Sequence, residues 1–65
     1  MIGQRIKELR LEKNMNQETL AGALHIARST LAHYETGARD VPNELIPIIA
    51  RYFDVSTDYL FGLEN

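Results

Sequence analysis

One stretch restricts the folds open to this chain more than any other: residues 16–37, NQETLAGALHIARSTLAHYETG. It contains two short runs with helical apolar spacing, separated by a brief gap. Asn16 is a favoured helix N-cap, and Gly37 is the residue type that most often ends a helix. His25, in the gap, tolerates a left-handed backbone better than most side chains do, so it can reverse the chain. The stretch therefore predicts two short helices joined by a tight turn.

The second of these helices, Ala27 to Glu35, has two different faces. On a 3.6-residue period Leu31 and Tyr34 point to one side, as expected for residues that pack against a core. The opposite side presents a guanidinium, a hydroxyl, a methyl and an imidazole group, carried by Arg28, Ser29, Ala32 and His33. These groups can contact the edges of DNA bases. We therefore predict that this helix reads DNA.

The rest of the chain follows the same pattern of short helices with recognisable ends. Asn14 and the segment 54–56 supply further stops and caps, and Pro47 is expected to displace a helix start instead of breaking a helix. No strand-like alternation or internal repeat competes with this pattern. The predicted fold is an all-α, compact five-helix bundle that forms one domain over residues 1–65. Its expected helices are Ile2–Lys13, Gln17–Leu24, Ala27–Glu35, Asn43–Phe53 and a short helix capped by Ser56 that runs to Phe61.

The composition excludes several classes of function. A chain of 65 residues has room for one core, and the absence of cysteine removes disulfides and thiol chemistry. His25 and His33 belong to different elements without a carboxylate at ligand-like spacing, so we expect no metal site. No glycine-rich phosphate loop or acid–base set is present, so we expect no enzyme activity, no cofactor and no small-molecule ligand. No apolar run approaches the roughly 20 residues that span a bilayer, and there is no signal-peptide core, so we expect a cytoplasmic protein with no membrane partner.

The charge is unevenly distributed along the chain. The formal net charge is −2, which is unfavourable for a protein that binds nucleic acid. Residues 1–39 hold six basic and four acidic groups, and residues 40–65 hold one basic and five acidic groups. The first part therefore carries +2 and the second −4, so the acidity lies away from the candidate reading helix.

Four segments that occur in order along nearly the whole chain, IGQRIKELR, NQETLAGAL, RSTLAHYETG and ARYFDVSTDYLFG, resemble a known family. The chain is similar to helix-turn-helix domains of the Cro and phage-repressor type, also called the xenobiotic-response-element family. The resemblance implies a lambda-repressor-like bundle with a helix-turn-helix unit at about residues 17–35. In such units the second helix lies in the major groove of DNA.

The same resemblance implies roles for individual residues. The base-reading positions of the family fall on Arg28, Ser29 and His33, with Ala27 at the helix start. The phosphate-contacting positions fall on Gln17, Thr30 and the loop from Thr36 to Arg39. Arg10 and Glu35 occupy positions that form a buried ion pair in related repressors. The chain departs from the family pattern at three positions. The family usually has Gly where His25 stands, Ser or Thr where Ala27 stands, and Arg or Lys where His33 stands.

The functional expectation is a sequence-specific, duplex-DNA-binding transcriptional regulator, a repressor that acts as a homodimer on a near-palindromic operator. Four apolar residues near the C-terminus are expected to be core and chain end, with a dimer face as the alternative: Tyr59, Leu60, Phe61 and Leu63. Arg28 could instead be a solvated surface arginine and His33 a neutral exposed histidine. The net charge leaves a second class open, a protein-interaction module on the same fold, such as an antitoxin-like or antirepressor partner.

Overall fold

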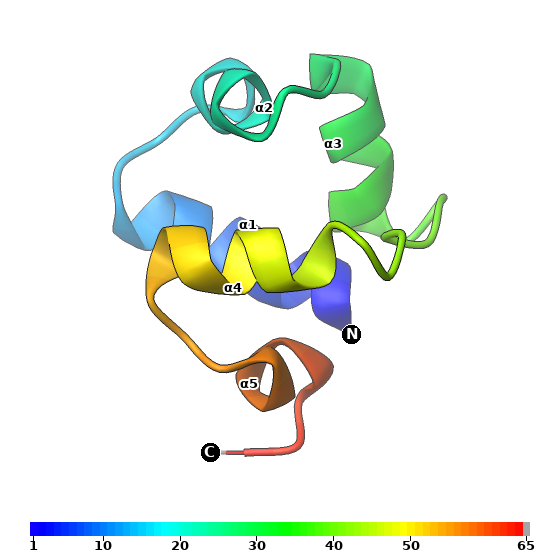
Figure 1. The fold of residues 1–65 in the computed structure, drawn as a ribbon. Helices are drawn as coiled ribbons and strands as arrows, with labels where there is room; N and C mark the ends of the chain where they lie inside the picture. Colours follow the sequence, from blue (N-terminus) through cyan, green and yellow to red (C-terminus); the bar gives the residue numbers. More distant parts are fainter. Residues whose placement is uncertain (65) are drawn as a thin grey trace.

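The computed structural model describes residues 1–64, which form five helices joined by turns and loops (Figure 1). They are α1 (Ile2–Glu12), α2 (Gln17–Leu24), α3 (Arg28–Thr36), α4 (Ile46–Phe53) and α5 (Thr57–Phe61). The predicted all-α, five-helix architecture is therefore confirmed. The predicted domain extends to Asn65, which lies outside the described residues.

The helix ends follow from local chemistry at both caps and stops. The side chain of Asn16 accepts a hydrogen bond from the backbone N–H of Thr19 at 2.8 Å, and Ser56 Oγ accepts one from that of Tyr59 at 2.9 Å. Each bond satisfies a backbone donor that the first turn of a helix leaves without an intrahelical partner. The three non-glycine residues with left-handed backbones all follow a helix: Asn14, His25 and Asp54. The predicted stops at these positions are confirmed.

Two predicted helix starts are displaced in the structure. Helix α3, the predicted reading helix, begins at Arg28, because Ala27 has an extended backbone and serves as an N-cap without a side-chain hydrogen bond. Helix α4 begins at Ile46 and not at Asn43, because Pro42–Leu45 forms a turn closed by a bond from the N–H of Leu45 to the carbonyl of Pro42. Pro47 then lies in the first turn of α4, where its missing N–H removes no helical hydrogen bond. The expected displaced start at Pro47 is confirmed, and the Asn43 boundary is wrong.

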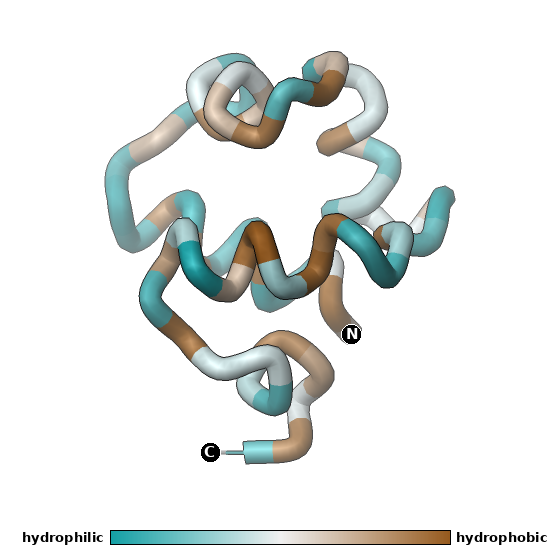
Figure 2. The backbone as a smooth tube through the Cα atoms, in the orientation of Figure 1, coloured by the Kyte–Doolittle hydropathy of each residue, from teal (hydrophilic) through white to brown (hydrophobic). Residues whose placement is uncertain are grey.

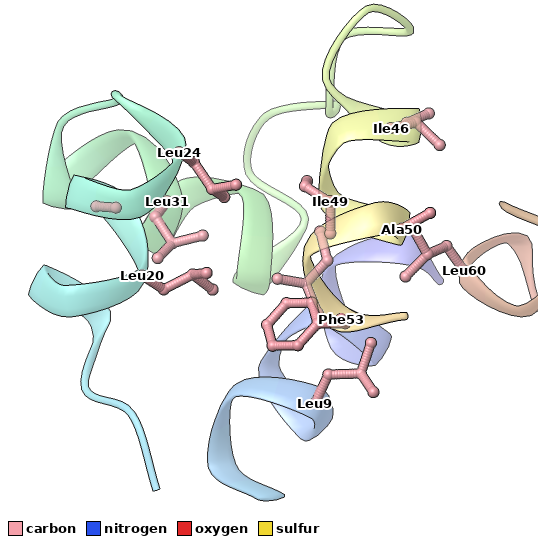
Figure 3. Close-up of a cluster of buried hydrophobic side chains, with 11 residues drawn as sticks. Leu9, Leu20, Leu24, Leu31, Ile46, Ile49, Ala50, Phe53 and Leu60 are labelled. Carbon is pink, nitrogen blue, oxygen red and sulfur yellow. The ribbon is translucent and has the colours of Figure 1, made fainter. Parts of the chain in front are cut away.

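The core lies between the α2–α3 pair and α4. Leu20, Leu24 and Leu31 extend from α2 and α3 towards Ile49 and Phe53 of α4 (Figure 3). The turn after α1 and the loop after α3 are among the hydrophilic parts of the backbone (Figure 2). The complete burial of large apolar side chains is the main source of stability in a chain this short. The largest fully buried side chains are Ile6, Leu20, Leu31, Ile49 and Leu60.

Helix α1 is packed unusually closely against α3. A Cβ atom placed on Gly3 would lie 1.8 Å from the carbonyl oxygen of Tyr34 and 3.1 Å from the Cα of Glu35. Only a residue without a side chain allows this approach, so Gly3 sets the distance between the two helices. Helix α3 is therefore fixed on its inner side by the backbone of α1.

None of the helices within residues 1–64 combines the length and the apolar content that crossing a membrane requires.

Candidate nucleic-acid interface

The burial pattern of α3 divides the helix into an inner and an outer side. Leu31 is fully buried and Tyr34 is 5% exposed, whereas Arg28, Ser29 and His33 are exposed. Thr30 and Ala32 are intermediate, and Ala27 is exposed at the start of the helix. The two faces predicted from the periodicity are therefore present, and the candidate base-reading side chains share the outer one. Their contacts with DNA remain predictions.

The turn between α2 and α3 has a defined backbone geometry. His25 has φ 59° and ψ 41°, and the N–H of Ile26 donates to the carbonyl of Ala21 at 3.0 Å. This bond, five residues back along the chain, is the Schellman arrangement that accompanies a left-handed helix end. Ile26 is partly buried against the core, as expected from its position. The turn thereby fixes the direction in which α3 leaves α2.

A buried ion pair holds the end of α3 to α1. Arg10 Nε donates to Glu35 Oε2 at 2.8 Å, and Arg10 Nη2 donates to Glu35 Oε1 at 3.1 Å. The two side chains are 9% and 2% exposed. Arg10 Nη1 also donates to the backbone carbonyl of Met15 at 2.8 Å. One guanidinium thus joins α1, the turn that follows it and α3, and its planar geometry suits the two-pronged contact with a carboxylate.

Gln17 connects this ion pair to Arg28, the first residue of α3. Its Nε2 donates to Glu35 Oε1 at 3.1 Å, and its Oε1 accepts a hydrogen bond from Arg28 Nη1 at 3.1 Å. A carboxylate can only accept and a guanidinium can only donate, so these two neighbours permit a single orientation of the amide. The Gln17 amide has a second N–H, and Arg28 has four further N–H donors for other partners.

Sequence reasoning did not find these two contacts of Gln17. The resemblance implies a phosphate contact for Gln17, and nothing in the local pattern relates it to Glu35, which lies 18 residues away. A distance of this kind depends on how α2, α3 and α1 pack together. The only sequence signal was the expected Arg10–Glu35 pair, which places a carboxylate near the start of α2.

The loop after α3 folds back onto the end of the helix. Thr36 Oγ1 donates to the carbonyl of His33 at 3.2 Å, and the backbone N–H of Arg39 donates to the same carbonyl at 3.2 Å. Thr36 and Arg39 are exposed, and Gly37 has a left-handed backbone. The candidate phosphate-contacting residues thus come from three places around the outer face of α3, namely the start of α2 (Gln17), α3 itself (Thr30) and the following loop (Thr36 and Arg39).

An exposed polar helix, set against a second helix by a fixed turn on an all-α core, defines the helix-turn-helix class of DNA-binding domains. The family model described as helix-turn-helix matches residues 6–60. The chain therefore belongs to the helix-turn-helix family of the Cro and phage-repressor type, a family of non-enzymatic DNA-binding transcriptional regulators with the lambda-repressor-like fold.

Several bacterial proteins are similar to this chain. It is 38% identical to the uncharacterized HTH-type transcriptional regulator YobD of Bacillus subtilis over 65 residues, all of this chain and 58% of YobD. It is 42% identical to the HTH-type transcriptional regulator AnsR of the same species over 61 residues, 94% of this chain and 53% of AnsR. It is 43% identical to the antitoxin PezA of Streptococcus pneumoniae over 56 residues, 86% of this chain and 35% of PezA.

The chain spans about half the length of YobD and of AnsR. No solved structure matches it significantly.

Proposed function

We propose that this chain binds duplex DNA sequence-specifically in the cytoplasm and represses transcription as a homodimer on a near-palindromic operator. The observation that carries the proposal is the outer face of α3. Arg28, Ser29 and His33 are exposed there, while the opposite side of the same helix is held by the core and the Arg10–Glu35 pair. A rigid helix with exposed polar side chains can present them to base edges without a large loss of conformational entropy on binding.

Arg28 is the strongest candidate for base recognition. Its guanidinium uses one N–H for Gln17, and other N–H groups can hold guanine O6 and N7 together, which is the commonest specific pairing between an amino acid and a base. Ser29 and His33 would contact neighbouring bases. Ala27 can offer its methyl group to a thymine methyl at the start of the helix.

The phosphate contacts would set the orientation of α3 in the groove. The second N–H of Gln17, the hydroxyl of Thr30 and the guanidinium of Arg39 carry donors that phosphate oxygens accept. Thr36 would contribute by exchanging the bond that its hydroxyl donates to the carbonyl of His33 for one to a phosphate. Backbone N–H groups at the starts of α2 and α3 are further anion donors. These contacts position the protein and carry no sequence information by themselves.

A dimer would read two half-sites. Two copies related by a two-fold axis would place their α3 helices in successive major grooves, about 34–36 Å apart, so the operator would be nearly palindromic. A protein bound across a promoter excludes polymerase sterically, which makes repression the simplest outcome of occupancy.

A protein-interaction module is the second candidate function. The charge of −4 over residues 40–65 and the similarity to an antitoxin favour it. Salt dependence separates the two candidates. A protein that neutralises phosphates loses DNA affinity steeply as salt rises, whereas an interaction module would show only weak, sequence-blind binding.

Selection of bound duplexes from a random DNA pool at physiological salt tests the proposal. Enrichment of a two-fold motif supports a dimeric sequence reader, and the spacing of its half-sites tests the docking geometry. Enrichment of one half-site alone contradicts the dimer and retains DNA reading. Absence of any enriched sequence contradicts the proposal and favours the interaction module.

A further inference from the structure

The exposed side of α4 has an apolar character that its position in the fold does not explain. Ile48 is 46% exposed and Tyr52 is 47% exposed, although α4 already buries Ile49 and Phe53 in the core. Ile48 and Tyr52 lie one helical turn apart and therefore on the same side of α4. Tyr52 is also held in place, because its ring packs edge-on against Phe53 and its hydroxyl lies 3.8 Å from the sulfur of Met15.

Two opposite charges flank these apolar residues along the helix. Arg51 follows Ile48 by three positions within α4 and therefore lies on the same side of that helix. Glu44 precedes Ile48 by four positions and lies in the turn that leads into α4. This turn runs directly into the helix, because the N–H of Ile46 donates to the carbonyl of Asn43 and the carbonyl of Leu45 accepts a bond from the N–H of Ile49. Both charged residues are exposed. Within residues 1–64 the only ion pair is Arg10–Glu35, so neither charge has an opposite partner.

We infer that this surface, formed by Glu44, Ile48, Arg51 and Tyr52 and called the α4 surface below, is where two copies of the chain pair. A two-fold axis beside Ile48 would set two α4 helices antiparallel. Ile48 would then meet its own copy, and Glu44 of each chain would lie opposite Arg51 of the other. The same surface on both copies is self-complementary, as a two-fold contact requires. Pairing here uses none of the candidate base-reading residues.

The charge pattern favours this surface over the apolar C-terminal segment. Phe61 is 47% exposed and Leu63 is 75% exposed, so they offer comparable apolar area. Residues 52–65 contain acidic groups and no basic residue. The cation beside this segment is Arg5 of α1, which lies over the ring of Tyr59 at 4.6 Å from its centroid. A two-fold contact there would still bring more acidic than basic groups together, which opposes association. The inference rests on the proposed function in one respect, since it locates the dimer contact that the two-fold operator assumes.

Sedimentation equilibrium of the full chain without DNA, over a wide concentration series, tests the inference. The wild-type chain is expected to dimerise reversibly, and more weakly at high salt. Glu44→Arg or Arg51→Glu alone should weaken dimerisation about tenfold, because each substitution acts twice across a two-fold axis. The double variant Glu44→Arg/Arg51→Glu should restore it. Ile48→Glu should make the chain monomeric.

Matched variants separate this surface from other effects. Leu11→Glu changes an exposed leucine of α1, which is 54% exposed, and should leave dimerisation unchanged. Thermal unfolding of each variant shows that the exposed substitutions leave the fold intact. A monomeric wild type, dimerisation that persists in Ile48→Glu, a double variant as weak as the singles, or a loss caused by Phe61→Glu instead would each overturn the inference. Because DNA is absent, these outcomes are independent of the duplex selection that tests DNA reading.

Discussion

Arg10 and Glu35, which are 25 residues apart in the chain, share two hydrogen bonds in the interior of the bundle. The carboxylate accepts from Arg10 and from Gln17, and the guanidinium also donates to the carbonyl of Met15. Every charged atom of the pair that is buried therefore has a partner, which agrees with the absence of unsatisfied buried side-chain polar atoms within residues 1–64. Through Met15 and Gln17 the pair connects α1 and α3 to the start of α2.

Removing one member of this pair should be strongly destabilising. Arg10→Ala leaves the Glu35 carboxylate buried without its cation, and we expect a loss of about 3–5 kcal/mol in the free energy of unfolding. The double replacement Arg10→Met/Glu35→Leu removes both charges and should recover most of that loss. Urea unfolding of the single and double variants measures both effects. An Arg10→Ala chain as stable as wild type would show that the pair contributes little.

The close approach of α1 and α3 predicts opposite effects for two glycines. Gly3→Ala places a methyl group on the backbone of Tyr34, which cannot move away as a flexible side chain could, so stability should fall by about 1–3 kcal/mol. Gly22→Ala, inside α2, meets nothing within 4 Å and should raise stability by about 0.5–1 kcal/mol. Melting temperatures of the two variants provide the comparison, and a stabilised Gly3→Ala chain would contradict the packing described.

The left-handed backbone of His25 should carry a small energetic penalty. A side chain at φ 59° crowds its own backbone, so His25→Gly should stabilise the chain by up to about 1 kcal/mol, offset partly by the greater freedom of glycine in the unfolded state. Asn14→Gly is the matched control, since asparagine tolerates this conformation better and should gain less. Equal gains at both positions, or none at His25, would mean that the turn is not strained by its side chain.

Arg28 and Arg39 should differ in what they contribute to DNA binding. Arg28→Ala should remove about 1–3 kcal/mol of discrimination at one base pair, whereas Arg39→Ala should weaken binding to all sequences alike and lower the salt slope by about one. Affinities for the selected operator and its single-base variants, measured over a salt series, separate the two. Unchanged relative affinities in Arg28→Ala would remove the base-reading assignment.

The sequence was informative at most positions where the structure depends on near neighbours, and the start of α4 is the exception. The caps at Asn16 and Ser56 and the turn at His25 each involve residues within a few positions, so their chemistry is visible in the sequence. The start of α4 was placed too early, because Asn43 resembles a cap while the chain instead makes a turn before Ile46. A helix that starts at Asn43 and one that starts at Ile46 differ by about one turn, and the propensities of single residues do not distinguish between them.

The candidate site was predictable in its composition and not in its connections. Periodicity was enough to place Arg28, Ser29 and His33 on one face, since that depends on α3 alone. The bonds from Gln17 to Glu35 and Arg28 depend on the packing of three helices, which no local pattern encodes. The resemblance implied the partner of Arg10 and missed the second acceptor role of the same carboxylate.

The separation of α3 into two sides has a consequence for how such a protein can change. The residues that hold the helix in place, Leu31, Tyr34 and Glu35, face inward, while Ser29 and His33 face outward and are exposed. Substitutions at the two outward positions should therefore have little effect on folding, and under the proposed function they would act mainly on which DNA sequence is preferred. On that proposal, a duplicated copy would acquire a new operator through a few such changes while keeping its scaffold, which would make this domain a suitable starting point for engineered recognition.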